Sequence, residues 1–137
     1  MKIKISEIAY YGRFYSNLTE HVIWWFCTLD FQICDTETII SVYGFSSIEE
    51  ILDSSKFIPL FKTDIIELEK KFLKEKNIAL EKIGSEIQRI QDFDKCFKIF
   101  IEAAYLTQHW HMFEKQHLFS DAIVWCKNNA IPFVKEM

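Results

Sequence analysis

The sequence predicts an α+β fold that is predominantly α-helical, with a small N-terminal β element (a hairpin) and three or four packed C-terminal helices. Half of the residues are apolar and 16% are aromatic, which is ample for a hydrophobic core. Glycine and proline are scarce, so the chain has few tight turns and favours long helices. After Pro59, apolar residues recur at helical spacing.

The N-terminal third carries mixed signals. From Leu18 to Leu29 the apolar residues follow helical spacing, but the stretch is also rich in β-branched and aromatic residues, so both helix and strand remain open. Further on, two apolar stretches flank Asp35-Thr36-Glu37, which has the chemistry of a turn. The stretches, Phe31 to Ile33 and Ile39 to Tyr43, predict the hairpin.

Two helix starts are marked by capping residues. Ser47 precedes Glu49 and Glu50, which favours a short helix with acidic residues in its first turn. Asp64 precedes a longer amphipathic segment and predicts a helix there. The apolar face of this segment consists of Ile65, Leu68 and Phe72.

Two further apolar stripes follow. The first has 3-4-3 spacing but contains Gly84, which argues against an uninterrupted helix. It consists of Leu80, Ile83, Ile87 and Ile90. The second predicts the best amphipathic helix of the chain. Its members are Phe93, Cys96, Phe97, Phe100, Ile101 and Ala104.

The last helical region is not simply amphipathic. Four apolar residues share one face, but at about 100° per residue Trp110 points to the opposite side. Either the helix breaks near His117, or it packs on more than one side. Asn128-Asn129 suit a helix end, and residues 130–134 then predict a short strand. The four residues of the shared face are Phe119, Ala122, Ile123 and Cys126.

Composition limits the classes of function. No linker or repeat interrupts the chain, which predicts a single domain over residues 1–137. The formal net charge of −4 lacks the basic footprint of a nucleic-acid-binding protein. The longest apolar run, Val22 to Cys27, is far short of the roughly 20 residues of a membrane span. We therefore expect a cytoplasmic protein with reduced cysteines, no membrane partner and no cofactor.

The C-terminal part and a segment near Pro59 carry a family pattern. The residues are Trp110-x-x-Phe113, Ala122-x-x-Trp125-Cys126, Asn128 or Asn129 with Ile131, and upstream Phe57-Ile58-Pro59-Leu60, Asp64, Phe72 and Lys4 to Ile8. This pattern resembles the bacterial uncharacterised protein family one-five-eight. Ala130 stands where that family usually has glycine. The family has no assigned activity, so the resemblance implies a type of fold and no catalytic role.

The aromatic excess is the best functional lead. Large rings are enriched at binding hot spots, and they also dominate small cores. The candidate binding residues are Trp24, Trp25, Trp110 and Phe113. With no catalytic constellation visible, they favour a non-enzymatic module that binds another protein.

Two alternatives stay open. Glu114, His117 and Asp121 share one helix face, and Glu-x-x-His occurs in carboxylate-bridged metal sites, which would make the protein a small metal-dependent enzyme. The ligand count favours a solvated surface instead. A Cys126 nucleophile is disfavoured because it falls near a helix C-terminus. Small size and acidity also suit an immunity- or antitoxin-like protein.

Overall fold

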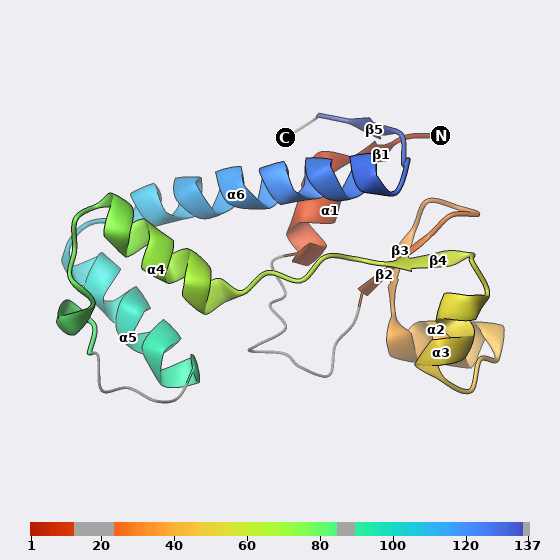
Figure 1. Ribbon diagram of the computed structural model, residues 1–137, viewed down its shortest axis with the longest axis horizontal. Helices are drawn as coiled ribbons and strands as arrows, with labels where there is room; N and C mark the ends of the chain where they lie inside the picture. Colours follow the sequence, from red (N-terminus) through yellow and green to blue (C-terminus); the bar gives the residue numbers. More distant parts are fainter. Residues whose placement is uncertain (13–23, 85–89, 136–137) are drawn as a thin grey trace.

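The computed structural model describes residues 1–12, 24–84 and 90–135, and it confirms a mostly helical α+β fold (Figure 1). The helices are α1 (Ile5–Gly12), α2 (Thr36–Tyr43), α3 (Ile48–Asp53), α4 (Ile65–Glu75), α5 (Ile90–Ala103) and α6 (Thr107–Asn128), with a 3₁₀ turn η1 (Leu80–Lys82). The strands are β1 (Ile3–Lys4), β2 (Trp24–Cys27), β3 (Ile33–Asp35), β4 (Phe57–Pro59) and β5 (Phe133–Val134). None of the helices in these ranges is long and apolar enough to cross a membrane.

The strands form two small sheets. In the three-stranded sheet, β2 lies in the centre and pairs antiparallel with both β3 and β4. In the other sheet, β1 pairs parallel with β5, which places the first and last strands side by side (Figure 1). Residues 24–27 of the ambiguous N-terminal stretch are therefore strand, and residues 18–23 lie outside the described residues.

The structure contains a hairpin, but it lies earlier in the chain than the sequence predicted. Its strands are β2 and β3, whereas residues 39–43, expected to be the second strand, belong to α2. Asp35 is not a hairpin turn residue but the N-cap of this helix, because its side chain accepts a hydrogen bond from the Thr38 N–H. Asp35 therefore does change the direction of the chain, but it does so by beginning a helix.

Both capped helix starts are confirmed. The Ser47 side chain accepts a hydrogen bond from the Glu50 N–H at the start of α3, and Asp64 accepts one from the Glu67 N–H at the start of α4. Helix α5 also follows the predicted pattern, with Phe93, Phe97 and Ile101 buried. The stripe from Leu80 does not form one continuous helix, as Gly84 indicated, since η1 ends before Gly84, whose φ is +118°.

Helix α6 is continuous and packs on two sides, as one of the two alternatives predicted. Apart from Trp125, its buried residues recur every fourth position, and each such step rotates the buried stripe by about 40° around the helix. They are Trp110, Glu114, Leu118, Ala122 and Cys126. The first half of α6 therefore faces α4 and α5, and the second half faces α1.

Within the part of the chain that the structure describes, three apolar clusters form the core. The first cluster joins β1, α1, β2 and the second half of α6, and consists of Ile3, Ile5, Ile8, Ala9, Phe26, Leu60, Leu118, Ala122, Trp125, Cys126 and Ile131. The second cluster joins α4, α5 and the first half of α6, and consists of Ile65, Ile66, Leu68, Phe72, Leu73, Ile83, Phe93, Phe97, Ile101 and Trp110. The third cluster lies under α2 and α3, and consists of Trp25, Cys27, Ile39, Ile51 and Phe57.

The end of α6 yields a prediction about stability. Ile131 N–H donates to the Cys126 carbonyl and Ala130 N–H to the Lys127 carbonyl, which is the Schellman arrangement. It forces Ala130 to a φ of +55°, a conformation that costs a residue with a Cβ about 1–2 kcal/mol. Glycine escapes this cost and gives back about 0.4–1 kcal/mol through its freer unfolded chain. Ala130→Gly is thus expected to raise the free energy of unfolding by about 0.5–1 kcal/mol.

Urea unfolding of purified protein measures this change. The matched control is Ala103→Gly in the last turn of α5, where glycine brings no such relief and is expected to cost up to about 1 kcal/mol. A loss of stability in both variants would contradict the strain at Ala130.

Candidate functional site

Two of the predicted binding rings are core residues. Trp25 is 1% exposed in the third cluster, where its indole N–H donates to Thr36 Oγ1 at 2.8 Å. Trp110 is 2% exposed in the second cluster, where its ring meets Phe72 and Phe97 edge-on. In this fold neither ring is presented to a partner.

The other two predicted rings are half-buried and lie far apart. Phe113 packs against the second cluster and its ring also contacts His117, with 4.3 Å between the ring centroids. Trp24 packs against the first cluster and contacts Tyr11, with centroids 4.6 Å apart. The four residues therefore form no common surface patch.

The structure does not gather the predicted metal ligands either. Glu114 is buried, His117 is half-buried against Phe113, and Asp121 is exposed. Across residues 1–12, 24–84 and 90–135, no group of three or more His, Cys, Asp or Glu side chains is arranged to hold a metal ion. Cys126 is buried in the first cluster, and burial raises the pKa of its thiol to about 11. It is therefore protonated at neutral pH and is a poor nucleophile.

The most perturbed carboxyl group lies between α4, α5 and α6. Glu69 is 0% exposed, and burial, together with the facing carboxyl of Asp94, raises its pKa to about 10. If both groups were ionised, both Glu69 oxygens and Asp94 Oδ1 would be buried without a donor. A proton on Glu69 satisfies two of these three atoms, because the acid then donates to Asp94, whose Oδ2 already lies 3.1 Å from Lys98 Nζ.

This carboxyl pair lies between packed helices, and Glu69 is closed off from solvent. Glu69 belongs to the buried face of α4, between residues of the second cluster, and it lines none of the hollows described below. Perturbed pKa values also arise in structural networks, and the burial of Glu69 identifies this as one of them.

A groove lies between α1 and α6, the two helices that pack most extensively on each other. One wall consists of Ser6, Ala9 and Tyr10 of α1, and the other is a single face of α6. The hollow between them measures about 270 Å³. The α6 wall has the helical spacing i, i+3, i+4, i+7 and i+8, and consists of His111, Glu114, Lys115, Leu118 and Phe119.

The groove has an apolar floor and an aromatic, polar rim. Ala9 and Leu118, which line it, are buried, and so is Glu114. At the rim, Lys115 Nζ lies 5.5 Å from the centroid of the Phe119 ring, a cation–π arrangement. Tyr10 is 52% exposed, and its ring meets Tyr11 edge-on with centroids 5.2 Å apart.

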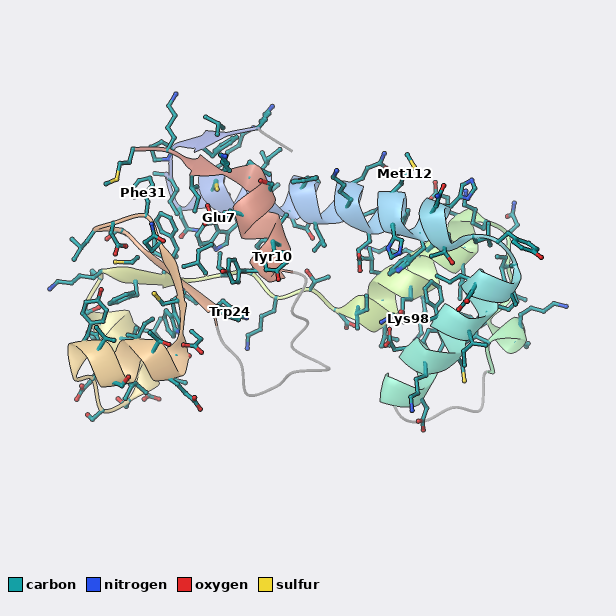
Figure 2. The ribbon with its side chains drawn as sticks, turned by 180° about the vertical axis from the view of Figure 1, so that it is seen from behind. Glu7, Tyr10, Trp24, Phe31, Lys98 and Met112 are labelled. Atoms are coloured by element: carbon teal, nitrogen blue, oxygen red, sulfur yellow. The ribbon has the colours of Figure 1, made fainter. Side chains whose placement is uncertain are left out.

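A second hollow of about 700 Å³ opens from the same place, since Ser6 and Tyr10 line both. Its other walls are β1 with Met1 and Lys2, and the turn from Asp30 to Gln32. Figure 2 shows Glu7, Tyr10, Trp24 and Phe31 in one part of the molecule, on and near α1 and well away from Lys98. The two hollows form one surface, which we call the α1 groove.

The turn at the edge of the α1 groove holds a strained residue. Phe31 has a φ of +56°, which bulky residues rarely adopt. A hydrogen bond from its N–H to the Cys27 carbonyl and edge-on packing of its ring on Phe26 hold it there. Backbone strain of this kind clusters at binding sites, where it fixes the position of a side chain.

The α1 groove was missed from the sequence. The signal for α1 was present, because Ile5, Ile8, Ala9 and Gly12 follow helical spacing and are the residues it buries. Nothing in the sequence indicates that this helix packs beside Lys115 and Phe119, more than 100 positions away.

Comparisons with protein-family models, with curated proteins and with solved structures give no match for this chain. The resemblance to family one-five-eight therefore stays a prediction, and the assignment of function rests on the geometry alone.

Proposed function

We propose that this protein is a non-enzymatic module of the bacterial cytosol that binds a segment of another protein in the α1 groove. The observation that carries the proposal is the groove itself: the hollow between α1 and α6 has an apolar floor bordered by Tyr10 and Phe119, and Phe31 lines the adjoining hollow. Partly exposed aromatic side chains around an apolar centre are the usual anchors of protein interfaces. Aromatic side chains thus remain the proposed contacts with the partner, but they are not the rings that the sequence singled out.

The polar groups of the groove suit recognition of a peptide. Ser6, Tyr10, His111 and Lys115 around the floor carry both hydrogen-bond donors and acceptors. These polar groups are spread over an open surface rather than clustered, which favours hydrogen bonding to a peptide that has both polar and apolar side chains. By contrast, the acidic group and the thiol with strongly raised pKa, Glu69 and Cys126, line neither hollow.

Capture of a partner by the tagged protein, read by quantitative mass spectrometry, tests the proposal. Tyr10→Ala removes an exposed ring at the rim of the groove. Ser6→Arg introduces a large side chain at the boundary between the two hollows. Truncating an interface hot spot costs about 2 kcal/mol or more, so Tyr10→Ala is expected to weaken the partner's affinity about 30-fold.

The matched control is Tyr105→Ala, because Tyr105 is 92% exposed and lies between α5 and α6, outside the α1 groove. It is expected to retain the partner. A stoichiometric partner that both groove variants capture as well as the unmodified protein would refute the groove as its binding site. All variants are checked for an unchanged circular dichroism spectrum.

A further inference from the structure

The helices α2 and α3 expose more large apolar side chains than they bury. Only Ile39 and Ile51 are fully buried, both in the third cluster. Four others are between 37% and 67% exposed: Val42, Tyr43, Ile48 and Leu52. Helix α4 shows the ordinary pattern for comparison, since all its large apolar residues are buried, namely Ile65, Ile66, Leu68, Phe72 and Leu73.

The exposed residues come from neighbouring parts of the two helices. Val42 and Tyr43 end α2, a loop of four residues follows, and Ile48 begins α3. Ile48 and Leu52 are four positions apart and share one face of α3. Tyr43 rests its ring edge-on against Phe57, with centroids 5.1 Å apart, and keeps its other side in solvent. Both helices lie at one end of the molecule, away from α4 and α5 (Figure 1).

The same segment is acidic, with no basic residue among its carboxylates. Residues 33–55 contain five carboxylates and no lysine, arginine or histidine, so their formal charge of −5 exceeds the −4 of the whole protein. Two of these carboxylates serve the fold: Asp35 caps α2, and Glu50 accepts hydrogen bonds from the Ser46 N–H and hydroxyl. Glu37, Glu49 and Asp53 are exposed, and no basic side chain of their own segment neutralises them.

We propose that the exposed face of α2 and α3 is a second docking surface, which binds a basic amphipathic segment of a partner protein. The apolar residues of that segment contact Val42, Tyr43, Ile48 and Leu52, while its lysines or arginines pair with Glu37, Glu49 and Asp53. Charge complementarity selects this occupant, because an acidic or neutral segment gains nothing from the exposed carboxylates. The surface shares no residue with the α1 groove.

Nuclear magnetic resonance titration of the full-length, isotope-labelled protein tests the proposal. The probe is a synthetic amphipathic peptide of leucine and lysine, about four helical turns long. One control peptide has the same composition with leucines on all faces, and another has glutamate in place of lysine. We expect the first peptide to shift the amide signals of residues 36–53, with an affinity about tenfold or more above either control and falling with added salt.

Two variant pairs separate the apolar and the charged contributions. Val42→Gln/Leu52→Gln and Glu49→Lys/Asp53→Lys are each expected to weaken the peptide about tenfold or more. Glu81→Lys/Glu102→Lys, which reverses two exposed carboxylates elsewhere, is expected to leave its affinity within about twofold.

Three results would overturn the proposal: equal binding of the scrambled basic peptide, shifts centred outside residues 36–53, or no effect of either α2–α3 variant pair. Tyr10→Ala is expected to leave peptide binding unchanged, because Tyr10 lies in the α1 groove. Failure of this docking surface is thus distinguishable from failure of the α1 groove.

Discussion

Trp110→Ala is expected to lower the free energy of unfolding by about 3–5 kcal/mol, the usual cost of removing a large buried ring. Trp110 is the residue at which α6 meets α4 and α5. Its ring lies 5.5 Å from that of Phe72 and 4.9 Å from that of Phe97, centroid to centroid, both edge-on. Its loss leaves a cavity that these rings fill only in part, and it removes their edge-to-face contacts as well.

Chemical denaturation followed by circular dichroism measures the effect. The control is Met112→Ala two positions further on, because Met112 is exposed and its truncation is expected to change stability by less than about 0.5 kcal/mol. If Trp110→Ala were as stable as Met112→Ala and lost a partner instead, Trp110 would be a binding residue after all, as the sequence first indicated.

Glu69→Gln is expected to stabilise the protein increasingly as the pH rises from 5 to 8. In the unfolded chain Glu69 ionises near its ordinary pKa of 4.5, whereas in the folded protein it keeps its proton until about pH 10. Between these values the folded state binds one more proton than the unfolded state. Stability therefore falls by about 1.4 kcal/mol per pH unit through this group, roughly 3 kcal/mol by pH 7. Below pH 4.5 the carboxyl is protonated in both states and this loss is absent.

Glutamine has the shape of protonated glutamate and remains neutral, so it avoids the loss. It also donates a hydrogen bond to Asp94 from its amide group. Urea titration at several pH values measures the unfolding free energies of both proteins. The difference between their pH dependences is the contribution of Glu69. Glu67→Gln is the control, because Glu67 is exposed in an ordinary surface contact with Lys70. Parallel pH dependences of the original protein and Glu69→Gln would show that Glu69 is ionised in the folded state.

Local signals in the sequence predicted much of the fold. Ser47 and Asp64 mark helix starts because a capping side chain binds backbone N–H groups only three residues away. The spacing of Phe93, Phe97 and Ile101 predicted α5 for a similar reason, since one helix face must be buried. The hairpin was misplaced because Asp35 suits a turn and a helix cap equally well, and only the pairing of β3 with β2 separates the two.

The sites could not be predicted in this way. A tryptophan serves equally as core or contact residue, so the sequence singled out Trp25 and Trp110 without showing that Thr36, Phe72 and Phe97 enclose them. The acidic charge of residues 33–55 was legible in the sequence, but the exposure of Val42 and Leu52 beside it was not.

The sequence by itself determined the fold class, the capped starts of α3 and α4, and the apolar faces of α4 and α5, because these depend on residues within a few turns of one another. Only the tertiary structure decided that α6 packs on two sides, that Glu69 meets Asp94 and keeps its proton, and that Tyr10 and Phe119 line one groove. Each of these results arises where helices distant in the chain come together, and the burial that sets a pKa or shapes a groove exists only after they have packed.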